Sequence, residues 1–431
     1  LVPDWEWPYK LPKNWCWTTV GTICDGFQYG YTEKAIFEKI GPHFIRITDI
    51  GDGIINDSGA PYCKIDSDSF IKYKINKNDI LIARMGSVGE NGLATHNIDG
   101  VFASYLIRIV PRSNAKYVCN FLQTNLYWGQ ISGKAQGTTR LNVNANLLKN
   151  LIIPLPPLAE QQRIVDRIES LFAKLDEAKE KAQAVVDSFE TRKAAILHKA
   201  FTGELTAKWR EEHGVGMESW EHHQFSDLCA IVRGGSPRPA GNPRYYDGNI
   251  PFMKVADITR NDSPYISKVE YSVKEEGLKK TRMVEANTLL LTNSGATLGV
   301  PAITTIRTTF NDGIAAFIGL DIDSLLFYYY FWTSKTAFLR SINMGAAQPN
   351  LNTKLIGEVE IDVPQTAERV EIARVLNALL SKEQQAKETA EAALDQIDLM
   401  KKSILARAFR GELGTNDPNE ESAVELLKQI I

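Results

Sequence analysis

The chain has 431 residues, of which 44% are hydrophobic and 23% charged, and its formal net charge at pH 7 is −3. This length predicts two to three domains with cores of their own. No long apolar run and no secretory leader occurs, so we expect a cytoplasmic protein that does not contact a membrane. The acidic balance excludes a strong overall basic field. If the chain binds DNA, its cations must cluster on one face, or partner subunits must supply phosphate contacts.

Residues 1–155 are predicted to form a first globular domain. An apolar strand over residues 80–83 is followed by Arg84 and a glycine-containing turn, and a polar loop precedes the last strand. Basic, amide and small polar side chains on loops are the groups that contact base edges and phosphates. A solvated surface residue is an equally good explanation for each. The candidate DNA-binding residues here are Arg84, Ser87, Lys134, Gln136, Thr138, Thr139 and Arg140.

Residues 156–207 are predicted to form a long helical region. It begins after Pro156 and Pro157, and its apolar residues then recur at alternating steps of three and four from Ile164 to Ile196. This spacing is typical of a coiled-coil seam. A helix from Leu158 to Phe201 would be at most about 66 Å long at 1.5 Å per residue. Such a helix could act as a rigid spacer.

The second half of the chain repeats the first at an offset of 208 residues. Residues 196–205 recur at 404–413, and Glu160 has its counterpart in Glu368. The repeat predicts a second globular domain at 208–363, a second helical region at 364–414 and a tail at 415–431. We therefore expect an α+β fold with two similar α/β domains. Two long antiparallel helices would separate them as an intramolecular coiled coil with pseudo-twofold symmetry. The alternative is that each helix packs only on its own domain.

The second domain offers candidate DNA-binding residues at the matching places and in one further loop. The further loop is basic, aromatic and rich in proline. Here too a solvated surface residue is an equally good explanation, and Asn350 is also explained as a turn former. The candidates are Asn293, Ser294, Thr297, Gln348 and Asn350, with Arg233, Ser236, Arg238, Arg244, Tyr245 and Tyr246 in the further loop.

No motif for catalysis, a cofactor or a metal was found. The five cysteines form no C-x-x-C pair, which favours reduced thiols in the cores over a zinc site. The chain lacks a G-x-x-x-x-G-K-[ST] phosphate loop and an Asn-Pro-Pro-Tyr-like methyltransferase loop. We therefore expect no enzyme activity, no catalytic residue, no cofactor and no metal. The alternative is a methyltransferase with strongly divergent motifs.

Several segments resemble the specificity subunit of type I restriction–modification systems. They are residues 11–17 (LPKNWCW), 80–84 with Gly86 and Gly89, 152–164 (IIPLPPLAEQQRI) and 201–205 (FTGEL). The resemblance covers essentially the whole chain. It implies two target-recognition domains, each reading one half of an asymmetric bipartite site in double-stranded DNA, with the helices setting the gap.

The resemblance also implies partners. Two methylation subunits would dock on the helical regions, and motor-nuclease subunits would join the full complex. The second helical region departs from the pattern, because Gln365-Thr366 replaces Pro157-Leu158 and Arg369-Val370 replaces Gln161-Gln162. This departure argues against equal docking at both helices. The alternative function is a coiled-coil scaffold that joins two protein-binding domains.

Overall fold

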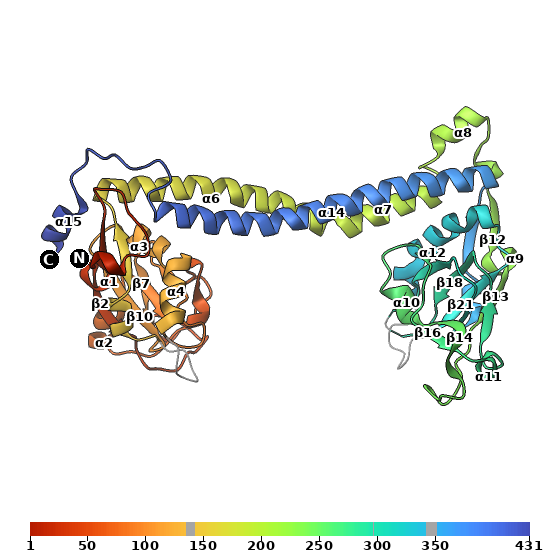
Figure 1. The fold of residues 1–431 in the computed structure, drawn as a ribbon, viewed down its shortest axis with the longest axis horizontal. Coiled ribbons are helices and arrows are strands. Elements are labelled where there is room, and N and C mark those ends of the chain that lie inside the picture. The colour runs from red at the N-terminus through yellow and green to blue at the C-terminus, as the bar shows by residue number, and fades with distance from the viewer. Residues whose placement is uncertain (135–142, 296, 342–350) are drawn as a thin grey trace. The chain divides into compact units, whose positions relative to one another are not determined.

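The chain forms two compact units (Figure 1). The computed structural model describes residues 1–134, 143–295, 297–341 and 351–431. Unit 1 combines Leu1–Gln183 with Glu391–Ile431, and unit 2 is Ala184–Ala390. Unit 1 is therefore discontinuous in sequence. The long helix α14 (Thr366–Ala408) contributes residues to both units.

The globular part of unit 1 is a mixed α/β domain. Its strands are β1 Cys16–Thr19, β2 Cys24–Tyr29, β3 His43–Ile45, β4 Ile50–Gly51, β5 Gly53–Ile55, β6 Lys74–Ile75, β7 Ile80–Ala83, β8 Asn91–Leu93, β9 Ile98–Phe102, β10 Leu106–Pro111 and β11 Ile152–Leu155. They form sheets of order β2-β10-β7-β8-β5-β4, β3-β9-β6 and β1-β11. The helices are η1 Asp4–Glu6, α1 Val20–Ile23, η2 Ile47–Asp49, α2 Ser67–Tyr73, α3 Ala115–Phe121, α4 Asn125–Lys134, α5 Ala145–Lys149 and α15 Ala423–Ile430.

Unit 2 contains a second domain with closely similar topology. Its strands are β12 Glu221–Gln224, β13 Ala230–Arg233, β14 Tyr246–Met253, β15 Tyr265–Ile266, β16 Tyr271–Val273, β17 Arg282–Val284, β18 Thr288–Thr292, β19 Pro301–Thr304, β20 Thr308–Phe310, β21 Ile314–Ile318 and β22 Glu360–Val363. They form sheets of order β13-β21-β18-β19-β15, β16-β14-β20-β17 and β12-β22. The helices are α8 Ala207–His213, η3 Met217–Ser219, α9 Phe225–Leu228, α10 Val255–Thr259, α11 Glu275–Leu278, η4 Ile322–Ser324, α12 Leu325–Ser341 and α13 Thr353–Gly357.

The central strands β7 and β18 read as continuous apolar runs because both of their faces are buried. In β7, Ile80 and Ile82 contribute to one hydrophobic cluster, whereas Leu81 contributes to another on the opposite face. In β18, Leu289 and Leu290 separate between two clusters in the same way. Each central strand is therefore firmly held, and the residue that follows it has a defined position.

Short polar motifs explain why the repeat survives in the loops. Asn144 and Asn352 precede α5 and α13, and each side chain accepts a hydrogen bond from the backbone N–H three residues on, at 2.9 and 2.8 Å. These are helix N-caps. Asp49 and Asp257 likewise accept the backbone N–H three residues before them, at 2.8 and 2.7 Å. The repeated residues thus stabilise the same local structure in both domains.

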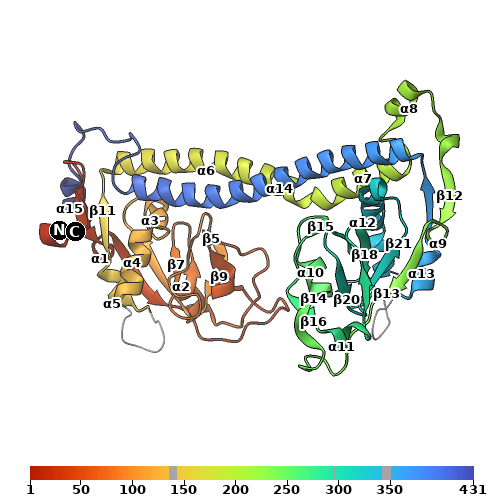
Figure 2. The same ribbon diagram turned by 45° about the vertical axis from the view of Figure 1, so that its right-hand side comes forward.

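The long helices pair in antiparallel fashion, as predicted. Helix α6 (Leu158–Asp187) lies alongside the C-terminal part of α14 in unit 1 (Figures 1 and 2). Lys179 Nζ lies 3.0 Å from Asp398 Oδ1, and Lys401 Nζ lies 2.5 Å from Asp176 Oδ1. The partner number falls as the residue number rises, which is an antiparallel register. The predicted α+β fold with a helix pair is confirmed.

The first long helix is interrupted, which the sequence pattern did not predict. Helix α7 (Phe189–Phe201) follows α6 after Ser188. The Ser188 hydroxyl donates to the carbonyl of Ala184, and the Arg192 guanidinium donates to the carbonyl of Val185 at 3.1 Å. Side chains that bind helix carbonyls disturb the backbone ladder locally. Arg192 Nε also lies 2.6 Å from Glu383 Oε2, so a contact with α14 holds the interruption in place.

Both helices end at a glycine in the left-handed region. Gly203 after α7 has φ 78°, and Gly411 after α14 has φ 73°. A Cβ on Gly203 would lie 2.5 Å from Met217 Sδ, and one on Gly411 would lie 2.5 Å from Pro12 Cγ. The positive φ therefore favours glycine at both helix ends, and at Gly411 close packing against Pro12 favours it as well. This accounts for the repeated Ala-Phe-x-Gly-Glu-Leu ending.

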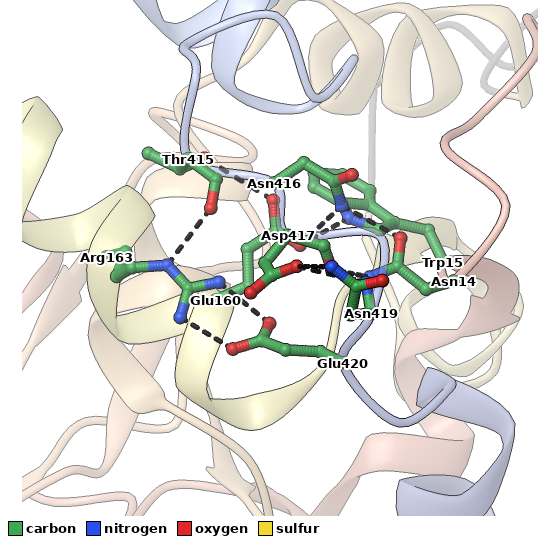
Figure 3. A network of polar contacts seen from close by, with 9 residues as sticks. All are labelled: Asn14, Trp15, Glu160, Arg163, Thr415, Asn416, Asp417, Asn419 and Glu420. Carbon is green, nitrogen blue, oxygen red and sulfur yellow. Dashed lines mark hydrogen bonds and ion pairs between the residues drawn. The ribbon is translucent and has the colours of Figure 1, made fainter.

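A buried carboxylate fastens α6 to the first domain (Figure 3). Glu160 is fully buried, and it accepts hydrogen bonds from Trp15 Nε1 at 2.8 Å and Asn416 Nδ2 at 2.9 Å. Thr415 Oγ1 lies 3.4 Å from its other oxygen. Because a buried carboxylate is costly without partners, these donors are required for the fold. They come from the beginning and the end of the chain.

The C-terminal segment continues this attachment. Arg163 makes a bidentate ion pair with Glu420, with both N–O distances 2.7 Å. Asn14 Nδ2 donates to the carbonyl of Asp417 at 2.9 Å. Leu427 on α15 is 4% exposed and belongs to the main hydrophobic cluster of the first domain. Residues 415–431 are thus an integral part of unit 1.

Unit 2 has an equivalent carboxylate with a different partner. Glu368 is 1% exposed and accepts from Trp220 Nε1 at 3.0 Å and from Thr206 Oγ1 at 2.7 Å. Arg210 Nη1 also donates to it at 2.6 Å, and this guanidinium is itself buried. The carboxylate of unit 2 is therefore neutralised by a cation, whereas Glu160 is held by neutral donors.

Candidate nucleic-acid interface

Arg84 is held at the end of the central strand of the first domain. Its guanidinium carbon lies 4.7 Å from the centre of the Tyr29 ring, a cation–π contact. Its Nε is buried and has no hydrogen-bond partner among the described residues. Its carbonyl accepts a hydrogen bond from the Val143 N–H at 3.0 Å. The Tyr29 ring thus holds the Arg84 guanidinium in place without using its hydrogen-bond donors.

The turn after Arg84 presents Ser87. Gly86 and Gly89 have φ values of 75° and 90°. A Cβ on Gly89 would lie 2.8 Å from the Trp128 ring, so this position requires glycine. Ser87 is exposed at the tip of the turn. The turn therefore keeps a small polar residue on the surface next to Arg84.

A hollow of about 1280 Å³ opens beside this turn, and our sequence interpretation did not include most of its residues. Tyr105 on its rim is 53% exposed. Burial, together with the charge of Asp52, raises the pKa of Glu90 in its wall. Ser87 was the one lining residue that the sequence interpretation named as a candidate, and the aromatic Tyr105 after strand β9 was a sequence signal that it did not use. The lining residues are Ile47, Thr48, Ile50, Gly51, Asp52, Met85, Gly86, Ser87, Val88, Glu90, Tyr105 and Trp128.

Several predicted residues lie outside the part of the chain that the structure describes. Lys134 is not one of these, because it is described as the last residue of α4. The remaining candidates of the two polar loops are in segments 135–142 and 342–350, and they stay predictions. They are Gln136, Thr138, Thr139, Arg140, Gln348 and Asn350.

Asn293 occupies the place in the second domain that Arg84 occupies in the first. It follows β18, and its carbonyl accepts from the Leu351 N–H at 2.7 Å, as Arg84 accepts from Val143. We expected an exposed side chain, but Asn293 is 0% exposed, and its side-chain oxygen and nitrogen have no partner among the described residues. Ser294 is half-buried and Thr297 is exposed. Buried polar atoms without partners are rare in proteins.

The basic loop of the second domain is organised around Asp312. Ser236 Oγ donates to its carboxylate at 2.6 Å, Arg238 Nη2 lies 3.5 Å from it, and Arg233 Nε donates to its carbonyl at 2.7 Å. Burial opposes ionisation of Asp312, but the hydrogen bond from Ser236, its own backbone and the two arginines outweigh it and lower its pKa. Both arginine side chains are exposed beyond this anchor. The structure thus brings three predicted residues together.

The other three loop candidates have different environments. Tyr246 is buried, its hydroxyl donates to the carbonyl of Pro237 at 2.8 Å, and burial raises its pKa. Arg244 is exposed, with its guanidinium carbon 5.6 Å from the Tyr245 ring centre. Arg244 is therefore accessible and Tyr245 is half-buried, whereas Tyr246 anchors the loop.

The described parts of the chain contain neither a metal-binding cluster nor a membrane-spanning helix. No group of three or more His, Cys, Asp or Glu side chains is arranged to hold a metal ion there. Within the same residues, no helix is both long and apolar enough to cross a membrane. All five cysteines are free thiols, and four of them are buried.

A duplicated domain that places different polar side chains on equivalent loops, joined to a pair of long helices, defines a two-domain recognition chain. The family model "Type I restriction modification DNA specificity domain" matches residues 28–186 and 217–394. These two matches cover more than half of the sequence. The chain therefore belongs to the type I restriction–modification DNA specificity family.

Individual relatives agree with this assignment. The specificity subunit of the type I restriction enzyme EcoKI from Escherichia coli strain K12 is 24% identical over 98% of this chain and 96% of its own. That of EcoBI from Escherichia coli is 30% identical over 48% of this chain and 45% of its own. The crystal structure of the HsdS subunit from Thermoanaerobacter tengcongensis has a TM-score of 0.65 and 19% identity. The aligned region covers 94% of this chain and 99% of that chain, which shows that the two proteins share a fold.

Family membership decides between the interpretations of the sequence. The chain is the DNA specificity subunit of a type I restriction–modification system, and so part of a complex that binds DNA. The specificity subunit is the non-catalytic component of such enzymes. The alternatives of a free-standing scaffold and of a divergent methyltransferase are therefore set aside.

Proposed function

We propose that each globular domain reads one half of a bipartite, asymmetric DNA site and that the helix pair sets the gap between the halves. The observation that carries this proposal is the exchange of side chains on one backbone scaffold. Arg84 and Asn293 follow equivalent buried strands and accept equivalent backbone hydrogen bonds, but they offer a guanidinium and an amide. Arginine pairs with guanine and asparagine with adenine in the major groove. Two domains of this kind recognise different half-sites.

The contacts with DNA are proposed for the predicted residues of both domains. In the second domain, Arg233, Arg238 and Arg244 are exposed on one loop and suit phosphates. Tyr246 supports the loop from inside, because its hydroxyl is already bonded to Pro237. Asn293 is buried, and its amide has no partner among the described residues, so a base edge is the partner proposed for it in the complex.

Exchange of the first domain tests the proposal. Residues 1–150 are replaced by the corresponding segment of another family member, and the methylated sites are mapped by sequencing genomic DNA from cells that make the complex. We expect one half of the modified sequence to change and the other half and the gap to stay. If both halves changed together, each domain would not be an independent reader.

For the partners, we propose two methylation subunits on the helical regions and motor-nuclease subunits in the full complex, in a cytoplasmic assembly. The proposed boundaries are 1–155, 156–207, 208–363, 364–414 and 415–431. The two helix starts differ in their contacts. Asn114 Nδ2 donates to Gln162 at 2.8 Å, whereas Arg369 Nη1 donates to Tyr328 at 2.8 Å. Unequal affinity of the two docking positions is therefore expected, and co-purification followed by native mass spectrometry measures their occupancy.

A further inference from the structure

Unit 2 contains a basic groove whose lining residues are not among the candidate DNA-binding residues. Helix α7 lies along α12 (Figure 2), and a groove of about 850 Å³ opens between them. Four of its lining side chains are of basic residue types, namely Lys193, His198, Lys335 and Arg340, and one is acidic, Glu190. This concentration stands out in a chain whose net charge is −3.

Three of the groove's cations lack an acidic partner in the described part of the chain. No ion pair joins Lys193, Lys335 or Arg340 to an acid among the residues described. Lys193 and Lys335 are half-buried, and Lys335 Nζ lies 5.3 Å from the centre of the Phe331 ring. Arg340 Nε donates to the carbonyl of Leu298 at 3.1 Å, which leaves its two terminal nitrogens for a ligand. Half-buried cations without acids are favourable sites for an anion.

Three of the hydroxyl groups that line the groove are already hydrogen-bonded within the protein. Thr333, Ser334 and Thr336 donate to the carbonyls of Tyr329, Phe331 and Gly299 at 2.9, 2.7 and 2.7 Å. Their protons are already used, so an anion would be held mainly by charge. Binding by charge alone does not distinguish sequences.

The position of the groove points to DNA as the source of the anion. Arg340 is anchored at Leu298, next to the exposed candidate Thr297, and Val300 lines the groove directly beyond. The groove therefore begins where the second domain presents its proposed reading residues. A DNA backbone that leaves these residues can continue over the cations.

The first half of the chain lacks the same set of charges. At the 208-residue offset, Lys335 and Arg340 correspond to Tyr127, which is buried, and to Ser132. Lys193 corresponds to Lys401, which is paired with Asp176 at 2.5 Å. Among the described residues, these uncompensated cations therefore occur at the positions of the second half and not at their three counterparts in the first.

We propose that the groove between α7 and α12 binds backbone phosphates of the DNA next to the second half-site. The inference rests on the proposed function, in which the second domain reads DNA. It adds a sequence-independent contact, and the described counterpart positions of the first half carry no matching set of cations. Lys193, Lys335 and Arg340 supply the charge, and the groove contributes to affinity and not to the choice of bases.

The test uses the full chain in its assembled complex and a duplex that carries the methylated sequence mapped for that complex. Lys193→Gln, Lys335→Gln, Arg340→Gln and the triple variant are compared with Lys208→Gln, which removes the same charge from α8 outside the groove. Affinity is measured across a range of salt concentrations. Each lost phosphate contact lowers the slope of log K against log salt by about 0.9. We expect this for the single variants and a fall of about 2 to 3 for the triple variant.

A second experiment locates the contact on the DNA, and a charge-conserving variant controls for misfolding. Single phosphates around the second half-site are neutralised as methylphosphonates. The wild-type complex should lose affinity at a few of them, and the triple variant should no longer respond at those positions. Lys193→Arg with Lys335→Arg should retain wild-type binding. The mapped half-site sequences should not change.

The outcomes separate the two proposals. Unchanged salt slopes in the triple variant, with normal binding by the wild type, would overturn the groove proposal alone. The groove proposal would also be overturned if the triple variant no longer assembled with its partner subunits but still bound DNA with the wild-type salt dependence. The groove would then hold an acidic segment of a partner. Insensitivity of the wild-type complex to changes in the second half-site would instead overturn the proposed function.

Discussion

Glu160 and Glu368 are equivalent residues that stabilise their units by different means. Each lies in the first turn of a long helix and accepts an indole N–H, from Trp15 or Trp220. Only Glu368 has a buried cation, Arg210, as a partner. The same substitution should therefore have different consequences at the two positions.

We expect Glu368→Gln to destabilise unit 2 by about 3 to 5 kcal/mol, because it leaves the Arg210 guanidinium buried and unpaired. Glu160→Gln should cost about 1 to 3 kcal/mol in unit 1, since it disturbs neutral hydrogen bonds without isolating a charge. Denaturant unfolding followed by hydrogen exchange measures each unit separately. Glu169→Gln, in an exposed ion pair with Lys116, is the control and should cost less than about 1 kcal/mol. Equal losses at Glu160 and Glu368 would contradict this explanation.

Asp312 should make the basic loop of the second domain sensitive to acid. Because the pKa of Asp312 is lowered in the folded chain, its stabilising contribution is present above the ordinary value of 3.8 and is lost as the pH falls through the folded value. Hydrogen exchange of residues 233–246, corrected for intrinsic rates, should therefore increase only below about pH 4. Asp312→Asn should show increased exchange already at pH 7, with no further acid transition. The exposed Asp262→Asn should behave as the wild type, and an acid transition that persisted in Asp312→Asn would refute the assignment.

For single residues, the sequence predicted where a residue lies relative to the strands. It did not predict whether the side chain is buried or which partners it has. The repeat placed Arg84 and Asn293 directly after central strands, where the structure also has them. Burial of Asn293 depends on segments far along the chain, such as Leu351, and no local pattern encodes it. Asp312 was missed for the same reason, since it lies 76 residues from Ser236.

At the scale of secondary-structure elements, the helix pair is the proposed spacer between the two half-sites. Four residues inserted near Glu204 or Leu205 add roughly one helical turn, about 6 Å if they are helical. One DNA step is about 3.4 Å, so the gap between half-sites should grow by one or two base pairs, with some loss of affinity because the second half-site also rotates. The half-site sequences should stay the same. Mapping of methylated sites measures this, and an unchanged gap with full activity would show that the helices are not the ruler.

The ends of the helices were easier to predict than their interiors. Pro156 and the repeated Gly203 and Gly411 act within a few residues, so the sequence indicates them directly. The interruption at Ser188 depends on Arg192 reaching Glu383 on another helix. Apolar spacing alone predicts one continuous helix, because it contains no information about such a contact.

At the scale of the whole molecule, residues 415–431 complete the first domain. Their deletion should destabilise unit 1 by about 3 to 6 kcal/mol, since it exposes the site of Leu427 and removes Asn416 from the buried Glu160. Unit 2 should keep its stability, because it contains none of these residues. Hydrogen exchange of the two units measures the difference. Deletion of the exposed Ile431 alone should have little effect, and equal destabilisation of both units would contradict the division.

Nothing in the local pattern of residues 415–431 indicates this role. They are polar and rich in turn formers up to the short apolar α15, and they resemble an ordinary tail. Their partners Asn14 and Glu160 lie about 400 and 250 residues away. A single sequence reveals periodicity and repeats, but not such distant pairings.

The discontinuity of unit 1 has a consequence for synthesis on the ribosome. Residues 184–390 leave the ribosome as an uninterrupted stretch, so unit 2 can close while translation continues. The first domain emerges earlier but must wait for Asn416 and Leu427 before Glu160 and the cluster beneath α15 are covered. The half that is made first is therefore finished last. A ribosome that stopped early would release a chain with one complete reader and one incomplete reader, and proteases would have an exposed target in the defective half.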